Sequence, residues 1–318
     1  MKAIVNALLL IGALIPSISS AREYPTGRVT LVIPFTAGGS NDAIGRYVAE
    51  NLSKLWRQVF VVENRAGGGS AVGATRVARS APDGHTLLLV SSSYTTNAAT
   101  RTDQPFDPVR DLQPVGMIAR GQVAIVTGSR VPMPTLADLV RESRARTIFY
   151  GTAGVGSTQH FNGELVNDAL GIRMTPVSYR GGAESLIDLA AGRIDVIVGT
   201  LGGLLPSIQS GTARPVAVLG RTRSDALPNV PTTAEEGYPA ATIMNYWAIF
   251  APAGTPAAVI AKINEGIRTV THSPEGRQFL ARLDGEPTEL SVDEVTAYVR
   301  TEIEQWTSLA RRLNITAD

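Results

Sequence analysis

Short apolar runs alternate with amphipathic stretches along most of this chain. The segment VTLVIPF at 29–35 is almost entirely apolar, which is typical of a strand covered on both faces. Residues 44–55 then carry apolar side chains at spacings of three and four, which predicts an amphipathic helix. Because such units follow one another, we expect an α/β fold with layers of helices over a sheet.

The same strand–turn–helix unit recurs further along the chain. VFVVEN at 59–64 precedes a glycine turn and a helical stretch, and HTLLLVSSSY at 85–94 is predicted to be a strand that ends in three serines. A later strand and helix flank GTAGVGSTQH at 151–160, and another pair flanks YRGGAES at 179–185. We therefore expect a second set of units beyond the first.

Two long apolar stretches, near 116–127 and 242–254, are predicted to be strands that carry the chain out of a first lobe and back into it. Three helices follow, with start signals at Thr255-Pro256, at Ser273-Pro274 and at Ser291 with Glu294. The expected division is a leader at 1–21, lobe 1 at 22–122, lobe 2 at 123–243, and a return strand with C-terminal helices on lobe 1 at 244–318.

The first 21 residues have the composition of an export signal. One basic residue precedes an apolar run from Ala3 to Ile15, and Ser19-x-Ala21 fits a signal-peptidase site. The alternative, a membrane anchor, is disfavoured because the run is shorter than the ~20 residues that span a bilayer. We expect a periplasmic protein that is cleaved after Ala21.

Composition excludes several classes of site. The whole chain has 29 basic and 28 acidic residues, so no strong positive charge favours nucleic acid. Cysteine is absent, and three dispersed histidines without a metal-binding pattern do not predict a metal site. We expect no cofactor, no metal and no catalytic residue.

Four glycine turns carry the candidate chemistry: TAGGSND, RAGGGSAVGA, GTAGVGSTQH and YRGGAES. The first N–H groups of a helix lack internal partners and lie at the positive end of its dipole, so each turn can bind an anion without a basic side chain. No Walker A lysine is present, and RAGGGSAVGA lacks dinucleotide-turn spacing, which leaves a structural helix start as the alternative there. Nearby hydroxyl groups, and the backbone N–H groups of Gly38, Gly39 and Gly156, are candidate donors.

Individual residues in these turns keep two interpretations. Ser40 or Asn41 is expected to cap the first helix, and Asp42 either complements its dipole or contacts the ligand. Ser157 lies three residues before His160, but the segment is not a G-x-S-x-G nucleophile turn. A secreted serine hydrolase is therefore a weaker alternative, and His160 is either a cleft residue or a structural one.

Seven segments, in order, resemble those of the Bug/TctC family, the extracytoplasmic solute receptors of tripartite tricarboxylate transporters. They are PFTAGGSNDAIGR, VENRAGGGSAVGA, PDGHTLLLVSSS, GTAGVGSTQH, YRGGAESLIDLAAGRIDV, LGRTRSDALPNVPTTAEEGYP and FAPAGTP. The resemblance implies a type II periplasmic-binding-protein fold, with two α/β lobes joined by two strands. It also implies a small carboxylated ligand held between the lobes by backbone amides, hydroxyls and waters.

The resemblance, together with the donors named above, gives the expected ligand site. The expected residues are Phe35, Ala37, Gly38, Gly39, Ser40, Asp42, Ser91, Ser92, Thr152, Gly156, Ser157, Thr158, His160, Tyr179, Arg180, Gly181, Asp195 and Thr200. Thr36-Ala37 stands where family members often have proline, so a less rigid first turn is expected. Glu184-Ser185 stands where Pro-Ala is common, which adds a solvated charge. Arg180 is either a rim residue or the partner of a second carboxylate.

The sequence therefore favours a solute-binding protein that delivers a dicarboxylate or an aromatic carboxylate to the permease subunits of such a transporter. A second hypothesis has the same protein present its ligand to the sensor kinase of a two-component system. A monomer is expected in either case.

Overall fold

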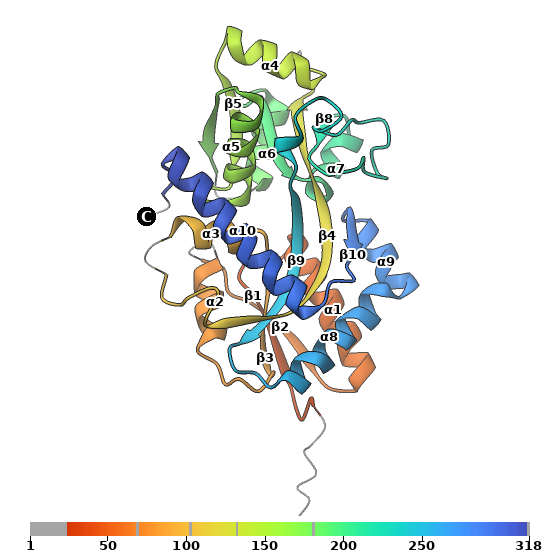
Figure 1. The fold of residues 1–318 in the computed structure, drawn as a ribbon. Helices are drawn as coiled ribbons and strands as arrows, with labels where there is room; N and C mark the ends of the chain where they lie inside the picture. The colour runs from red at the N-terminus through yellow and green to blue at the C-terminus, as the bar shows by residue number, and fades with distance from the viewer. Residues whose placement is uncertain (1–23, 68–69, 102–103, 132, 180–181, 317–318) are drawn as a thin grey trace, which may run out of the picture.

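The computed structural model describes residues 24–67, 70–101, 104–131, 133–179 and 182–316 (Figure 1). The expected leader, Arg180 and Gly181 lie outside the described residues. The strands form one ten-stranded sheet in the order β2-β1-β3-β9-β4-β7-β5-β6, with β8 and β10 also paired to β4. The strands are β1 Val29–Ile33, β2 Phe60–Asn64, β3 Thr86–Ser91, β4 Leu112–Gly128, β5 Ile148–Thr152, β6 Met174–Ser178, β7 Val196–Thr200, β8 Ala213–Val218, β9 Met244–Pro252 and β10 Gly285–Pro287.

The helices cover both parts of this sheet, as Figure 1 shows. They are α1 Ser40–Trp56, α2 Ala71–Ala78, α3 Ser93–Thr100, α4 Leu136–Ala145, α5 Thr158–Leu170, α6 Gly182–Ala191, α7 Leu201–Gln209, α8 Ala257–His272, α9 Pro274–Ala281 and α10 Val292–Leu313, with a short 3-10 turn at Pro239–Ala241. Among the described residues, none of these helices is both long and apolar enough to cross a membrane.

The directions of the strands place the carboxyl ends of β3 in lobe 1 and of β7 in lobe 2 at the junction between the lobes. In lobe 1, β1 is parallel to β2 and β3, and β9 lies antiparallel between β3 and β4. In lobe 2, β5 is parallel to β6 and β7, while β7 is antiparallel to β4. Therefore β3 points along β4 toward lobe 2, and β7 points back toward lobe 1. The helix starts that follow these strands face one another across the gap between the lobes.

The predicted connecting strands are confirmed as β4 and β9. β4 pairs with β9 from Leu112 to Gln122 and then with β7 from Val123 to Thr127. The change of partner falls between Gln122 and Val123, and the lobe boundary at 122/123 stays a prediction. The apolar clusters follow the same division, because lobe 1 packs around its own strands and lobe 2 around β5, β7 and β8.

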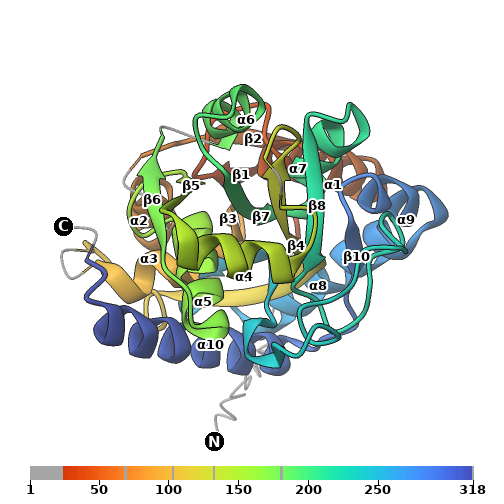
Figure 2. The ribbon, with the colours of Figure 1, turned by 90° about the horizontal axis from the view of Figure 1, so that it is seen from above.

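Helix α10 lies along both lobes on the side of the connecting strands (Figures 1 and 2). Near its C-terminal end, Trp306 packs edge-on against Phe161 of α5, with ring centroids 5.2 Å apart. Leu309, Ala310 and Ile315 belong to the same buried cluster. The lobes are therefore linked by this helix as well as by β4 and β9.

The predicted helix starts near the C-terminus are confirmed at two of three places. Ser273 caps α9, where its Oγ accepts from the N–H of Gly276, and Ser291 and Glu294 form the capping box of α10. At α8 the N-cap is Pro256 rather than Thr255, whose hydroxyl instead donates to the carbonyl of Pro252. Because the Thr255 side chain bonds to the preceding turn, it does not cap α8, and the helix begins one residue later.

Candidate functional site

A cleft of about 550 Å³ lies between the lobes. That volume falls within the ~300–1,000 Å³ that is typical of small-molecule sites. Its lining residues come from the two loops that open α1 and α5, from the starts of α2, α6 and α7, from the end of β3 and one face of α3, and from β9. They are Pro34, Phe35, Thr36, Ser40, Asn41, Ala66, Gly67, Ser70, Ser91, Ser93, Asn97, Arg101, Ala153, Val155, Ser157, Thr158, Gln159, Gly182, Thr200, Asn245 and Trp247.

Helix starts from both lobes converge on the cleft. Ser40, Ser93 and Thr158 are first residues of their helices, while Ser70 and Thr200 are N-caps. Each start brings N–H groups and the positive end of a helix dipole to the wall of the cavity, which favours an anion. This is the arrangement expected where the carboxyl ends of strands meet in an open α/β sheet.

The first turn, from Phe35 to Asp42, is held by the Asp42 carboxylate. It accepts from the N–H of Gly38 at 3.0 Å, from Nε of Arg46 at 2.9 Å and from Nδ2 of Asn64 at 2.9 Å. The Arg46 hydrogen bond is the main cause that lowers the pKa of Asp42 to about 2. Asp42 therefore fixes the turn from behind, and its carboxylate is not among the groups that line the cleft.

The cap expected on α1 is different in the structure. Gly39 is the N-cap, with extended backbone, and as a glycine it has no side chain that could accept from the first N–H groups of α1. The expectation that Ser40 or Asn41 caps the helix is wrong, because both residues already lie inside it. Their side chains line the cleft, and their backbone N–H groups are at the uncapped helix start.

The second turn, from Gly154 to His160, is built on the same plan. Ser157 caps α5 by accepting from the N–H of His160 at 3.3 Å, while Nδ1 of His160 accepts from the N–H of Gly156 at 3.2 Å. Nδ1 must therefore be unprotonated. Burial lowers the pKa of His160, although the charge of Glu164 opposes this shift. Of its two interpretations, this geometry favours the structural one.

Six of the expected residues line the cleft, and the structure places others behind it. Phe35, Ser40, Ser91, Ser157, Thr158 and Thr200 contribute to the lining. Ala37, Gly38 and Gly39 are exposed in the first turn, beside lining residues. Ser92 is buried, and its Oγ accepts from the N–H of Tyr246. Thr152 is also buried, and its Oγ1 accepts from the N–H of Gly154.

Two further expected residues point elsewhere. The Tyr179 hydroxyl donates to Asp188 at 2.8 Å. Asp195 precedes β7, whereas Thr200 ends it, so the two lie ~16 Å apart along a strand that rises ~3.3 Å per residue. The Asp195 carboxylate accepts from Arg146 at 2.8 Å and from the N–H of Phe149 at 2.9 Å. It holds the far edge of lobe 2 rather than the cleft.

Several lining groups have no partner within the described part of the chain. Oδ1 of Asn41, Oε1 of Gln159 and Nε1 of Trp247 are buried atoms without a hydrogen bond. Buried polar atoms are normally satisfied, so those at a cleft indicate groups that a ligand or its waters complete. None of the three is among the expected site residues, although Asn41 and Gln159 belong to the two turns that the sequence predicts at the site. Asn245 and Trp247 are two residues apart on β9, so both side chains lie on the same face of this connecting strand and line the cleft. This spacing was the signal in the sequence that could have predicted Trp247 at the site.

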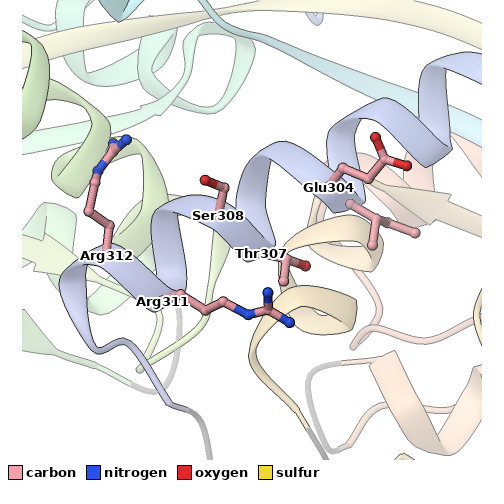
Figure 3. Close-up of a pocket in the computed structure, with 6 residues that line it drawn as sticks. Glu304, Thr307, Ser308, Arg311 and Arg312 are labelled. Carbon is pink, nitrogen blue, oxygen red and sulfur yellow. The ribbon is translucent and has the colours of Figure 1, made fainter.

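A second hollow, of about 670 Å³, lies along α10 (Figure 3). All of its lining residues, from Ile303 to Arg312, belong to that helix. At one end, Arg312 pairs with Asp168 of α5 at 2.6 Å. The hollow is therefore a helix surface beside an interlobe ion pair, without the converging helix starts of the cleft.

Comparisons with known proteins agree with this geometry. The model of the family described as tripartite tricarboxylate transporter family receptor matches residues 44–315. Protein BugT of Bordetella pertussis is 31% identical, over 92% of this chain and 91% of BugT. The solved structure of R. palustris Rpa4515 with adipate has 33% identity and a TM-score of 0.85, and covers 92% of this chain and 99% of that one.

A further solved structure, MatC from Rhodopseudomonas palustris with bound malate, has 26% identity and a TM-score of 0.81. It covers 90% of this chain and 99% of that one. These matches confirm the predicted periplasmic-binding-protein fold with two α/β lobes.

Proposed function

Because this chain belongs to the tripartite tricarboxylate transporter receptor family, we propose that it captures a small organic acid in the periplasm and delivers it to a membrane permease of that transporter class. The proposed ligand is a dicarboxylate or an aromatic carboxylate. The observation that carries the proposal is the cleft itself, where helix starts from both lobes converge with hydroxyl and amide groups.

The chemistry of the lining fits an anion such as a carboxylate and does not fit a cation. Hydroxyl groups of Ser40, Ser91, Ser93, Thr158 and Thr200 surround the cavity, and no acidic side chain lines it among the described residues. Hydroxyls and N–H groups can donate to carboxylate oxygens from several directions. The solved relatives bound to adipate and to malate support the same ligand class.

The strength of binding requires direct hydrogen bonds in addition to helix dipoles. A micromolar acid needs ~8 kcal/mol of binding free energy. One helix start contributes ~0.3–1 kcal/mol when exposed and up to ~2 kcal/mol when partly buried. Each charge-assisted hydrogen bond adds ~1.5–3 kcal/mol. Three or four such bonds from the hydroxyl and N–H groups of the cleft therefore suffice.

Ligand binding also favours one arrangement of the lobes. The cleft is lined by Ser40 of lobe 1 and by Ser157 and Thr158 of lobe 2, so a bound acid contacts both lobes. Contacts that exist only when the lobes are close stabilise the closed state over the open one. The closed form is then the one that the permease is proposed to recognise.

The test is a binding screen on protein that has been unfolded and refolded to remove any co-purified ligand. Thermal shift is measured against a panel of aliphatic and aromatic mono-, di- and tricarboxylates, and isothermal calorimetry then measures each hit. Matching methyl esters serve as controls because they keep the shape of the acid and lose its charge. We expect acids to bind and their esters to bind at least about tenfold more weakly. Absence of binding to every acid, together with hydrolysis of the esters, would show that the proposal is wrong.

A further inference from the structure

One face of α3 forms a polar row along the cleft. Ser93, Asn97 and Arg101 all line the cavity and follow one another at intervals of four residues. Residues four apart in a helix lie on the same face. At ~1.5 Å of rise per residue, the row extends ~12 Å from the start of α3 to its C-cap.

Arg101 brings the only charged side chain to the cleft lining within the described part of the chain. Its backbone is anchored, because its N–H donates to the carbonyl of Asn97 at 3.1 Å. Nε2 of Gln104 donates to the same carbonyl at 3.0 Å, and Nδ2 of Asn97 donates to the carbonyl of Ser93 at 2.7 Å. The backbone of Arg101, a partly buried residue, is thus anchored at one end of a row whose other end is a helix start.

We propose that Arg101 selects acids with two carboxylates, by binding the second carboxylate while the helix starts bind the first. A guanidinium recognises a carboxylate through two parallel N–H···O bonds, which uncharged hydroxyls cannot reproduce. The separation along α3 fits a ligand whose acidic groups lie at opposite ends of a chain. This inference rests on the proposed function and names the ligand class of the same cleft.

The experiment compares matched ligands and matched variants by calorimetry. Straight-chain di-acids of four to eight carbons are paired with mono-acids of equal length, hexanedioate with hexanoate among them. Arg101→Gln removes the charge, and Arg101→Lys keeps the charge without the planar fork. Arg110→Gln is the control, because Arg110 lies in a neighbouring hollow that Arg101 also borders and pairs with Asp111 at 2.9 Å.

For the best di-acid, we expect Arg101→Gln to weaken binding by about tenfold or more, and Arg101→Lys by less. The matching mono-acid should change by less than about twofold, and Arg110→Gln should leave both unchanged. Circular dichroism and thermal unfolding verify that each variant is folded. If Arg101→Gln is not folded, the di-acid-to-mono-acid affinity ratio of Arg101→Lys decides.

Several results would overturn the inference. The first is that wild type binds di-acids and mono-acids with equal affinity. The second is that Arg101→Gln leaves the affinity for di-acids unchanged. The third is that Arg101→Gln lowers the affinities for di-acids and mono-acids equally. In each of these cases acids still bind, so the proposed function survives. If the wild type binds no acid in the panel, the proposed function fails and the inference fails with it.

Discussion

Replacing Asp42 by Asn tests whether this carboxylate holds the first turn. The side chain is 8% exposed and accepts three hydrogen bonds, from Gly38, Arg46 and Asn64. Asn has a similar shape, but one carboxylate oxygen becomes an NH₂ group that cannot accept. At least one of the three donors then loses its acceptor, and the ion pair with Arg46 is lost.

The magnitude follows from the pKa of Asp42, which is lowered from 3.8 to about 2, mainly by the Arg46 hydrogen bond. A shift of that size corresponds to about 2 kcal/mol of folding stability at neutral pH. Because the folded-state pKa is depressed, this stability is present above the unfolded pKa and is lost as pH falls through the folded pKa. About 1 kcal/mol of it should disappear between pH 5 and pH 3.

The assay is urea unfolding of wild type and Asp42→Asn from pH 7 down to pH 3. We expect the variant to be less stable by about 2 kcal/mol at pH 7, with a difference that narrows toward pH 3. Ligand affinity should fall as well, because the Gly38 turn is no longer held. An equal stability at pH 7, or a difference that does not depend on pH, would refute the role assigned to the carboxylate.

Three further variants test other parts of the site. Gly39→Val should fold normally, since a Cβ there meets nothing within 4 Å, yet weaken acid binding more than about tenfold in calorimetry by blocking the uncapped start of α1. Burial raises the pKa of Glu302 from 4.5 to about 7. The folding stability linked to its bound proton is therefore present at low pH and is lost as pH rises through about 7. In urea unfolding, wild type should lose about 2 kcal/mol of stability between pH 5 and pH 8 for this reason, and Glu302→Gln should not show that loss. His160→Asn should keep an acceptor for the Gly156 N–H. It should also remove the loss of acid affinity that we expect in wild type when His160 becomes protonated, which requires a more acidic pH than usual because burial lowers the pKa of His160.

The controls separate these effects from general damage. Gly27→Val also places a Cβ in open space, but outside the cleft, so it should leave affinity unchanged. If it weakens binding as much as Gly39→Val, the effect does not come from the cleft. A pH profile of Glu302→Gln that matches the wild type would remove Glu302 as the titrating group. If His160→Asn still loses acid affinity at acidic pH, as wild type is expected to, His160 is not the group whose protonation causes that loss.

The layered fold and both connecting strands could be predicted because their apolar patterns are continuous and local. Two helices could not. The sequence of α3, SYTTNAAT, is poor in strong helix formers. In the fold, the Thr95 hydroxyl lies within hydrogen-bond distance of the carbonyl of Ser92 and of the carboxylate of the distant Glu302, a contact that the local sequence does not show. The sequence of α7, LGGLLPSIQ, contains Pro206 and two glycines. A Cβ on Gly202 would lie 2.1 Å from the carbonyl oxygen of Leu283, so packing against lobe 1 requires a residue that local propensity disfavours.

The site was predictable to the extent that each residue belongs to a local turn. Ser40, Ser157, Thr158 and Thr200 all lie where the chain passes from a strand into a helix, and each opens or caps that helix, so one sequence signal predicts their position. Arg101 lies eight residues after Ser93, at the end of helix α3, which the local sequence does not predict. Its place in the cleft depends on the direction of α3, which only tertiary packing sets.

The two cleft turns, 35–42 and 154–160, are stabilised by the same kind of hydrogen bond, and that bond limits which N–H groups can donate to a ligand. Gly38 and Gly156 both have positive φ, and each donates its N–H to a side chain four residues later, Asp42 in one lobe and His160 in the other. These two N–H groups are thus already used and hold the turns in shape. We therefore expect a ligand to accept from the first N–H groups of α1 and α5 and from the neighbouring hydroxyls. Hydrogen bonds of this kind explain how the first turn is ordered without proline at 36–37: the Asp42 carboxylate fixes its middle, and Asn64, which donates to the carbonyl of Phe35 at 3.1 Å, fixes its beginning.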